Sequence, residues 1–138
     1  MNTSHDLVST VVDYAHALTT GDYAHATTAG YSSRATTTGD YAHATTAGND
    51  AHALTAGYSA HATATGGHAH AATTGANSIA VAIGYNSSAR AAAGGFIVLA
   101  QYDEDTVVAV KTAQVGKDGI KPDTWYTLSP TGEFVEAE

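Results

Sequence analysis

The sequence predicts an all-β protein whose main body is a parallel β-solenoid, a β-roll or β-helix of nine-residue repeats. Between residues 12 and 92 a glycine recurs every nine residues, and the fifth residue after each glycine is alanine. Within each unit, small residues alternate with more varied ones. A fixed period of this length with alternation inside it is typical of short strands joined by corners and stacked in coils. The repeat glycines are Gly21, Gly30, Gly39, Gly48, Gly57, Gly66, Gly75 and Gly84.

Composition excludes several classes of function. The 138 residues include 13 acidic residues against 5 Lys and Arg, for a net charge of −8, which argues against nucleic acid as a partner. Cysteine is absent, which excludes disulfides and thiol catalysis. No apolar run is long enough to predict a membrane span. The opening MNTSHDLVSTVV lacks the pattern of a secretory signal, so the expected location is the host cytoplasm during expression or a phage virion.

The chain is expected to divide into three parts. Residues 1–11 are predicted to form an N-terminal capping strand, because the apolar stretch from Leu7 to Val12 could cover the open end of the solenoid. Residues 12–92 form the predicted repeat body, in which Val12 stands where later units have glycine. Residues 93–138 are predicted to form a C-terminal β cap.

Each repeat unit can be written as positions one to nine, starting at its glycine. Positions four, six and eight carry small residues, whereas positions five and seven carry the variety. The small positions are predicted to face inward, because His25, Arg34 and Arg90 cannot line a narrow interior. Glycine at position one is expected to supply either a positive φ or a close approach of two backbones.

Two coil sizes are compatible with the period. Two strands per coil give 18 residues and a flat roll, and three give 27 residues and a triangular prism. Tyr31, Tyr58 and Tyr85 recur at an interval of 27, which supports the prism. Alanine and threonine alone would leave a void inside a triangle, so the 18-residue coil is favoured, with 27 kept as the alternative.

After residue 92 the period stops and bulkier strands follow. Phe96 to Tyr102, Thr106 to Val115, Trp125 to Leu128 and Glu133 to Glu136 are predicted to form a small antiparallel β-meander, because turn residues separate them. The end of a solenoid is an open strand edge that invites aggregation, so a bulky cap at that place has a physical purpose.

Two segments of the chain resemble known families. The stretch NSIAVAIGYNSSARA at 77–91 resembles the head repeats of trimeric autotransporter adhesins, which implies stacked β-rolls that trimerise and bind host surfaces. Most of the chain is similar to prophage and gut-phage proteins of unknown role, which carry Gly-x-x-Ser-Thr-Ala-Thr-Thr-Ser arrays and a segment like IKPDTWY, here at 120–126. Histidine stands here where that pattern has threonine at position five. The likeness implies a phage or bacterial β-solenoid and transfers no activity.

Six histidines at position five are candidate metal ligands. In an 18-residue coil they fall into two rows, one on each face, with rings about 4.8 Å apart. Neutral imidazole suits Zn, Cu or Ni. The competing interpretation is an exposed ladder that tolerates any half-polar side chain, since Arg34 and Ile79 share the position. Stacked rings are expected to lower one another's pKa through like charge. The rows are His16, His52 and His70, and His25, His43 and His61.

Tyrosines and threonines offer two other candidate surfaces. Exposed aromatic rows at corners suit the binding of a protein or a surface glycan, although corner tyrosines can also simply pack on one another. A row of Thr27, Thr45 and Thr63 suggests an ice-binding array, but the neighbouring histidine rings would spoil a flat lattice. The corner aspartates lack the glycine pattern of calcium-binding nonapeptides. The corner tyrosines are Tyr23, Tyr31, Tyr41, Tyr58 and Tyr85.

The predicted function is that of a non-enzymatic structural or binding protein of phage or bacterial origin, acting as an adhesin- or fibre-like module. The histidines of the body are periodic, whereas an active site is a singular feature, so no catalytic residues and no cofactor are expected. A homo-oligomer is one possible state, and a trimer is the form favoured if the chain is oligomeric. Two alternatives stay open: an acidic intracellular interaction protein that blocks a host factor, and a repetitive ligand-binding array for metal or ice.

Overall fold

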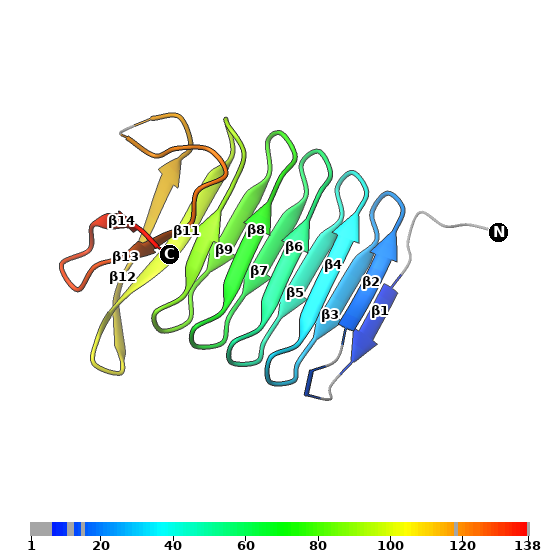
Figure 1. Ribbon diagram of the computed structural model, residues 1–138, viewed down its shortest axis with the longest axis horizontal. Helices are drawn as coiled ribbons and strands as arrows, with labels where there is room; N and C mark the ends of the chain where they lie inside the picture. The colour runs from blue at the N-terminus through cyan, green and yellow to red at the C-terminus, as the bar shows by residue number, and fades with distance from the viewer. Residues whose placement is uncertain (1–6, 11–12, 15, 118, 138) are drawn as a thin grey trace.

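The computed structural model describes residues 7–10, 13–14, 16–117 and 119–137. These residues form an all-β structure without a helix, in which parallel strands stack into a β-solenoid of about five turns. Successive strands alternate between two sheets, so the body is a flattened stack with its coils lying side by side along the long axis (Figure 1). The predicted fold class is therefore confirmed.

Each sheet has seven strands in the described part of the chain. Sheet A runs in the order β1 (Leu7–Thr10), β3 (His25–Thr28), β5 (His43–Thr46), β7 (His61–Ala64), β9 (Ile79–Ala82), β11 (Phe96–Asp103) and β12 (Thr106–Gln114). Sheet B runs in the order β14 (Phe134–Glu136), β13 (Tyr126–Leu128), β10 (Ser88–Arg90), β8 (His70–Thr73), β6 (His52–Thr55), β4 (Arg34–Thr38) and β2 (His16–Thr20).

The strand register decides the coil size. His25 pairs with His43 and His43 with His61, so each residue lies beside the one 18 positions later. The 18-residue coil is confirmed, and the 27-residue prism is wrong. Two flat sheets leave room between them only for small side chains, which is why alanine and threonine fill this interior without the void that a triangle would contain.

The inward face consists of positions four, six and eight, as predicted. Ala44 at position six is 0% exposed, as are its neighbours Ala26 and Ala62 on the adjacent strands of sheet A. Position eight adds a column of buried threonines whose hydroxyl oxygens have no hydrogen-bond partner, so the interior contributes less stability than its burial suggests. These threonines are Thr19, Thr28, Thr37, Thr46, Thr55 and Thr73.

At each corner, glycine allows two backbones to approach closely, and the residue two positions later adopts the left-handed conformation. A Cβ added to Gly57 would lie 2.0 Å from the carbonyl oxygen of Gly39 in the preceding coil, so glycine is required here for close backbone approach. The left-handed conformation falls instead on position three, where Tyr23 has a φ of 64° and Ser59 a φ of 53°. Of the two roles expected for the repeat glycine, close approach is the one that recurs from coil to coil.

The C-terminal strands differ from the predicted meander. β11 lies parallel to β9 and forms a hairpin with β12 on sheet A, whereas β13 lies antiparallel to β10 and forms a hairpin with β14 on sheet B. The predicted antiparallel cap is confirmed, but its strands are divided into two hairpins, because a two-sheet solenoid has two open edges at its end and each is covered by its own strand. The two hairpins lie at the left end of Figure 1, and each belongs to a different sheet.

The N-terminal end is described only in part. β1 pairs in parallel with β3 and forms the first rung of sheet A. The rest of the predicted capping strand at 1–11, and Val12 at the start of the repeat body, lie outside the described residues.

Removal of residues 96–138 is expected to make the repeat body aggregate. Without β11 and β13, the edges of β9 and β10 would be bare and could pair with other chains. Size-exclusion chromatography with light scattering of a 1–95 fragment, beside the full chain, checks this. A soluble, monodisperse fragment would show that the C-terminal hairpins do not protect these edges.

Candidate functional site

The histidine row of sheet A is built by strand register. Three consecutive strands of this sheet begin with histidine, and parallel in-register pairing places the three side chains above one another on the outer face. The rings of His25 and His43 have centroids 4.9 Å apart and are stacked, whereas those of His43 and His61 are 4.8 Å apart and tilted by 45°. The sequence therefore predicted the correct partners for this row.

The row of sheet B is interrupted. His52 and His70 stack with centroids 4.7 Å apart, but His16 pairs with Arg34, which separates it from the other two. The three histidines assigned to this face thus lie on one face, and only two of them are in contact.

Metal binding by these rows stays a prediction. Within the described residues, no group of three or more His, Asp or Glu side chains is arranged to hold a metal ion. His25 with His43, and His52 with His70, stack face to face, a geometry in which the ring nitrogens do not converge on one point. A metal at these rows would require the rings to turn.

Partial burial tunes the histidines toward the neutral form. Burial in the row lowers the pKa of His43, and the charges of His61 and His25 lower it further. The sequence predicts this direction from like charge alone, but in the structure desolvation is the larger cause.

The same holds on sheet B. Burial is the largest cause of the lowered pKa of His52, followed by the charges of His70 and Arg34. Burial also lowers the pKa of His70, whereas the carboxylate of Asp50 at the adjoining corner acts in the opposite direction on both rings. These two histidines are therefore biased toward neutral donors or acceptors of hydrogen bonds.

Acidification is expected to destabilise the protein through these histidines. Above the unfolded-state pKa of about 6.5 both states are neutral and this contribution to stability is complete. As the pH falls below that value the unfolded chain takes up protons first, so the free energy of unfolding falls until the lower folded-state pKa is reached. Melting curves from about pH 8 to about pH 5 should show a smaller loss for a His43→Thr, His52→Thr double variant than for the native chain.

His16→Thr, which replaces an exposed histidine paired with Arg34, serves as the control for this series. Equal pH dependence of the double variant and the native chain would contradict the effect assigned to partial burial.

The predicted tyrosine surface is divided between two corners. Tyr23 and Tyr41 stack with ring centroids 5.2 Å apart, and Tyr58 meets Tyr41 edge-on at 6.1 Å. Tyr31 and Tyr85 lie at the opposite corner of the coil, since they follow strands of sheet A rather than sheet B.

At that second corner the aromatic rings form two separate groups, and the second group extends past the last repeat to Tyr102. Tyr31 meets Tyr14 edge-on, and Tyr85 meets both His68 and Tyr102 edge-on. Asp50 accepts a hydrogen bond from Tyr31, and this raises the pKa of the phenol above its usual range. The corner tyrosines thus pack on their neighbours and still expose about half of their surface. This arrangement is compatible with both predicted roles, packing between corners and an exposed binding surface.

The corner aspartates have a structural role. Four position-two residues donate a backbone N–H to a carboxylate or amide oxygen of the residue 18 positions earlier: Tyr31 to Asp13, Asp40 to Asp22, Tyr58 to Asp40 and Gly67 to Asn49. Where position two is Asp or Asn, its side chain therefore links one coil to the next. The repeated Asp and Asn at position two are the sequence feature that could have predicted these hydrogen bonds.

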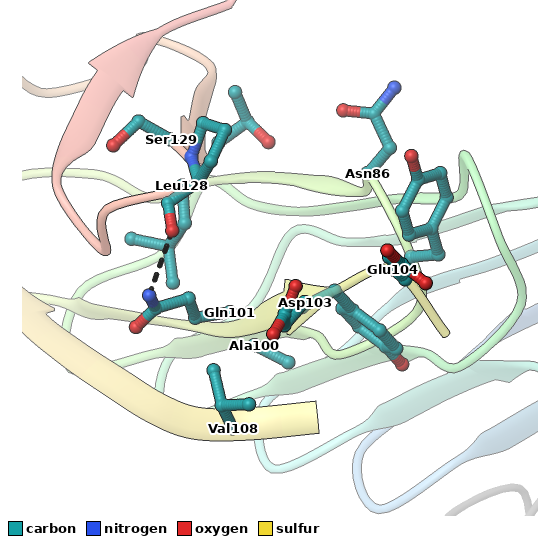
Figure 2. A pocket seen from close by; sticks show the side chains of 12 residues that line it. Asn86, Ala100, Gln101, Asp103, Glu104, Val108, Leu128 and Ser129 are labelled. Atoms are coloured by element: carbon teal, nitrogen blue, oxygen red, sulfur yellow. Dashed lines mark hydrogen bonds between the residues drawn. The ribbon is translucent and has the colours of Figure 1, made fainter. Parts of the chain in front are cut away.

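A hollow at the C-terminal end was not predicted. It has a volume of about 550 Å³ and is lined by the Tyr85 corner, the end of β11 and the loop after β13. Gln101 donates a hydrogen bond to the Pro130 carbonyl at 3.0 Å. Figure 2 shows Gln101 with this bond as a dashed line, and Asp103 and Glu104 among the side chains that line the hollow. Its described lining includes the carboxylates of Asp103 and Glu104 but no His, Lys or Arg.

A second hollow of about 190 Å³ lies on the outer face of sheet B, and we call it the sheet-B groove. The sequence analysis did not predict this groove, because its lining residues are far apart in the chain. Of these residues, only His52 and His70 belong to a row that the repeat pattern places on this face. It is lined by Arg34, Thr36, His52, Ala53, Leu54, His70, Ala72, Arg90 and Trp125.

Comparison with protein-family models, curated proteins and solved structures found no match to this chain. The resemblances to autotransporter heads and to phage repeat proteins therefore stay predictions. Within the described residues no helix has the length and apolar character needed to cross a membrane.

Proposed function

We propose that this chain is a non-enzymatic structural and binding module of phage or bacterial origin, used as a fibre- or adhesin-like rod. The observation that carries the proposal is the repetition of outward side chains at one-rung spacing, with ring centroids 4.7–4.9 Å apart in the histidine rows. Such a surface presents the same group many times to an extended or repetitive partner. Weak contacts that repeat in this way add up to useful avidity.

The end of sheet A supports self-association within this proposal. β12 is the terminal strand of that sheet, and it exposes Val107, Val108 and Val110 by about half of their surface or more. An exposed edge of this length with apolar side chains is a template for pairing with another chain. A homo-oligomer joined along β12 would cover it.

Two measurements on the purified chain test the proposal. Retention on arrays of immobilised glycans and host-surface proteins should reveal a partner, and native mass spectrometry should reveal an oligomer. Val110→Lys should weaken the oligomer, whereas Val135→Lys, which places the same charge on exposed β14, should not. A monomer with no retained partner would overturn the proposal.

A further inference from the structure

Both arginines of the chain lie on the same outer face of sheet B. Arg34 begins β4 and Arg90 ends β10, and both residues line the sheet-B groove. The whole sequence has only 5 Lys and Arg against 13 acidic residues. Because the described lining of this groove contains both arginines and no acid, the groove has a charge opposite to that of the whole molecule.

The groove exists because a small residue lies between larger ones. Position seven places Leu54, Ala72 and Arg90 on three successive strands, with Leu54 paired to Ala72 and Ala72 paired to Arg90. The methyl group of Ala72 cannot fill the space between its two neighbours, so the sheet face is hollowed at that rung. The hollow at Ala72 extends to His52 and His70, which also line it.

Trp125 forms one wall of the groove and orients Arg90. The guanidinium carbon of Arg90 lies 4.9 Å from the centroid of the indole ring, a cation–π contact. The edge-to-face contact of His70 with the same indole, at 5.1 Å, fixes the ring from another side. The Nε atom of Arg90 is buried and has no hydrogen-bond partner in the structure.

Neither arginine is neutralised by an acid of the described chain, in which the single ion pair joins Lys121 to Glu136. Asp50 is the acid that acts on the histidines of this face, and it does so from the corner beside them. The two guanidinium groups are therefore available to an external anion. The planar fork of arginine matches a carboxylate through two parallel hydrogen bonds.

We propose that the sheet-B groove binds the carboxylate-bearing sugars of an acidic glycan. The site deepens the proposed function and rests on it, because it assumes a module that binds a surface partner. A volume of about 190 Å³ suits one ring of a chain rather than a complete drug-sized ligand. Arg34 and Arg90 lie on strands three rungs apart, so each guanidinium group binds its own carboxylate along the sugar chain. The imidazoles of His52 and His70 and the hydroxyl of Thr36 are available for sugar hydroxyls.

A peptide fits this face less well than a sugar chain. Extended peptides commonly gain affinity by adding a strand to an open sheet edge. The groove instead lies on the face of β4, β6, β8 and β10, strands whose backbone groups already pair with their neighbours on both sides. The available groups are side chains alone, and they suit a ligand rich in hydroxyls.

Isothermal titration at low ionic strength tests the site with three probes: hexagalacturonate, the neutral maltohexaose and a hexaglutamate peptide. Hexagalacturonate should bind more tightly than the other two. Arg34→Gln should weaken this binding by about tenfold or more, the effect of a lost charge-assisted hydrogen bond. Lys111→Gln changes the net charge equally but lies on β12 of sheet A, so it should leave the affinity unchanged.

Because Arg34 is exposed, its replacement should not disturb folding, and an unchanged melting temperature verifies this. Equal weakening by Arg34→Gln and Lys111→Gln would reduce the binding to general charge attraction and overturn the site. Hexaglutamate binding as tightly as hexagalacturonate would overturn the glycan. Retention of the chain on another surface without hexagalacturonate binding would overturn the site alone, whereas no retention on any surface would overturn the proposed function as well.

Discussion

Gly57→Ala is expected to lower the free energy of unfolding by roughly 4 kcal/mol or more, which places it among the most damaging single substitutions. The added Cβ would lie 2.0 Å from the Gly39 carbonyl oxygen, 2.4 Å from its carbon and 2.9 Å from the Asp40 nitrogen. All three are backbone atoms of the neighbouring coil, so no side chain can move aside. Relief requires the two rungs to separate, which would break the hydrogen bonds that join them.

Gly67→Ala is the matched control for this substitution. A Cβ at Gly67 would meet its nearest atom, the side-chain oxygen of Asn49, at an ordinary contact distance of 3.5 Å. We expect its effect to lie within about 0.5 kcal/mol of zero, as for a surface change without a named defect. Urea denaturation of both variants measures the difference. Similar midpoints would contradict the close approach of successive coils at the corners.

Ala44→Leu is expected to destabilise the protein by about 1–3 kcal/mol or more, through overpacking. Ala44 is 0% exposed and lies between Ala26 and Ala62 in the same inward row. A leucine there would have to push the two sheets apart, and each sheet is held in place by the coils on either side. Neighbouring rungs would be strained together, because stability in a stacked repeat depends on each interface.

Thr45→Leu controls for the volume and apolar character of the new side chain. Thr45 is the next residue of β5 and faces outward, and Leu54 occupies the same repeat position on sheet B. This variant should unfold close to the native chain. If denaturation shows equal losses for Ala44→Leu and Thr45→Leu, the assignment of inward and outward positions fails.

Both destabilising substitutions bear on the proposed binding surfaces. The histidine rows exist only while His43 lies beside His61 and His52 beside His70, which is a consequence of register between coils. Separation of two rungs at Gly57 would break the row that crosses that interface. The repeated surface and the stability of the stack therefore depend on the same backbone ladders.

Local steric patterns account for what could be predicted about the candidate surfaces. Position five alternates out of phase with Ala44 and its equivalents, so the outward direction of the histidines follows from side-chain size alone. Small interior residues favoured the two-strand coil over a hollow triangle. With 18 residues per coil, the predicted sheet of each histidine is correct. The tyrosines were predicted as one class, because sequence position does not show that Tyr41 and Tyr85 lie at opposite corners.

The sequence by itself determined the period and the inward face, because glycine and alanine are required wherever backbones or sheets approach too closely for a larger residue. The tertiary structure decided between the 18- and 27-residue coils, and with them which residues pair between coils. It also decided where the chain returns after the last repeat. Trp125 reaches His70 and Arg90 because β13 pairs with the open edge of β10, and the second hairpin closes sheet A for the same reason. Contacts between segments distant in sequence decide which open edge each bulky strand covers. A local sequence pattern cannot predict these contacts.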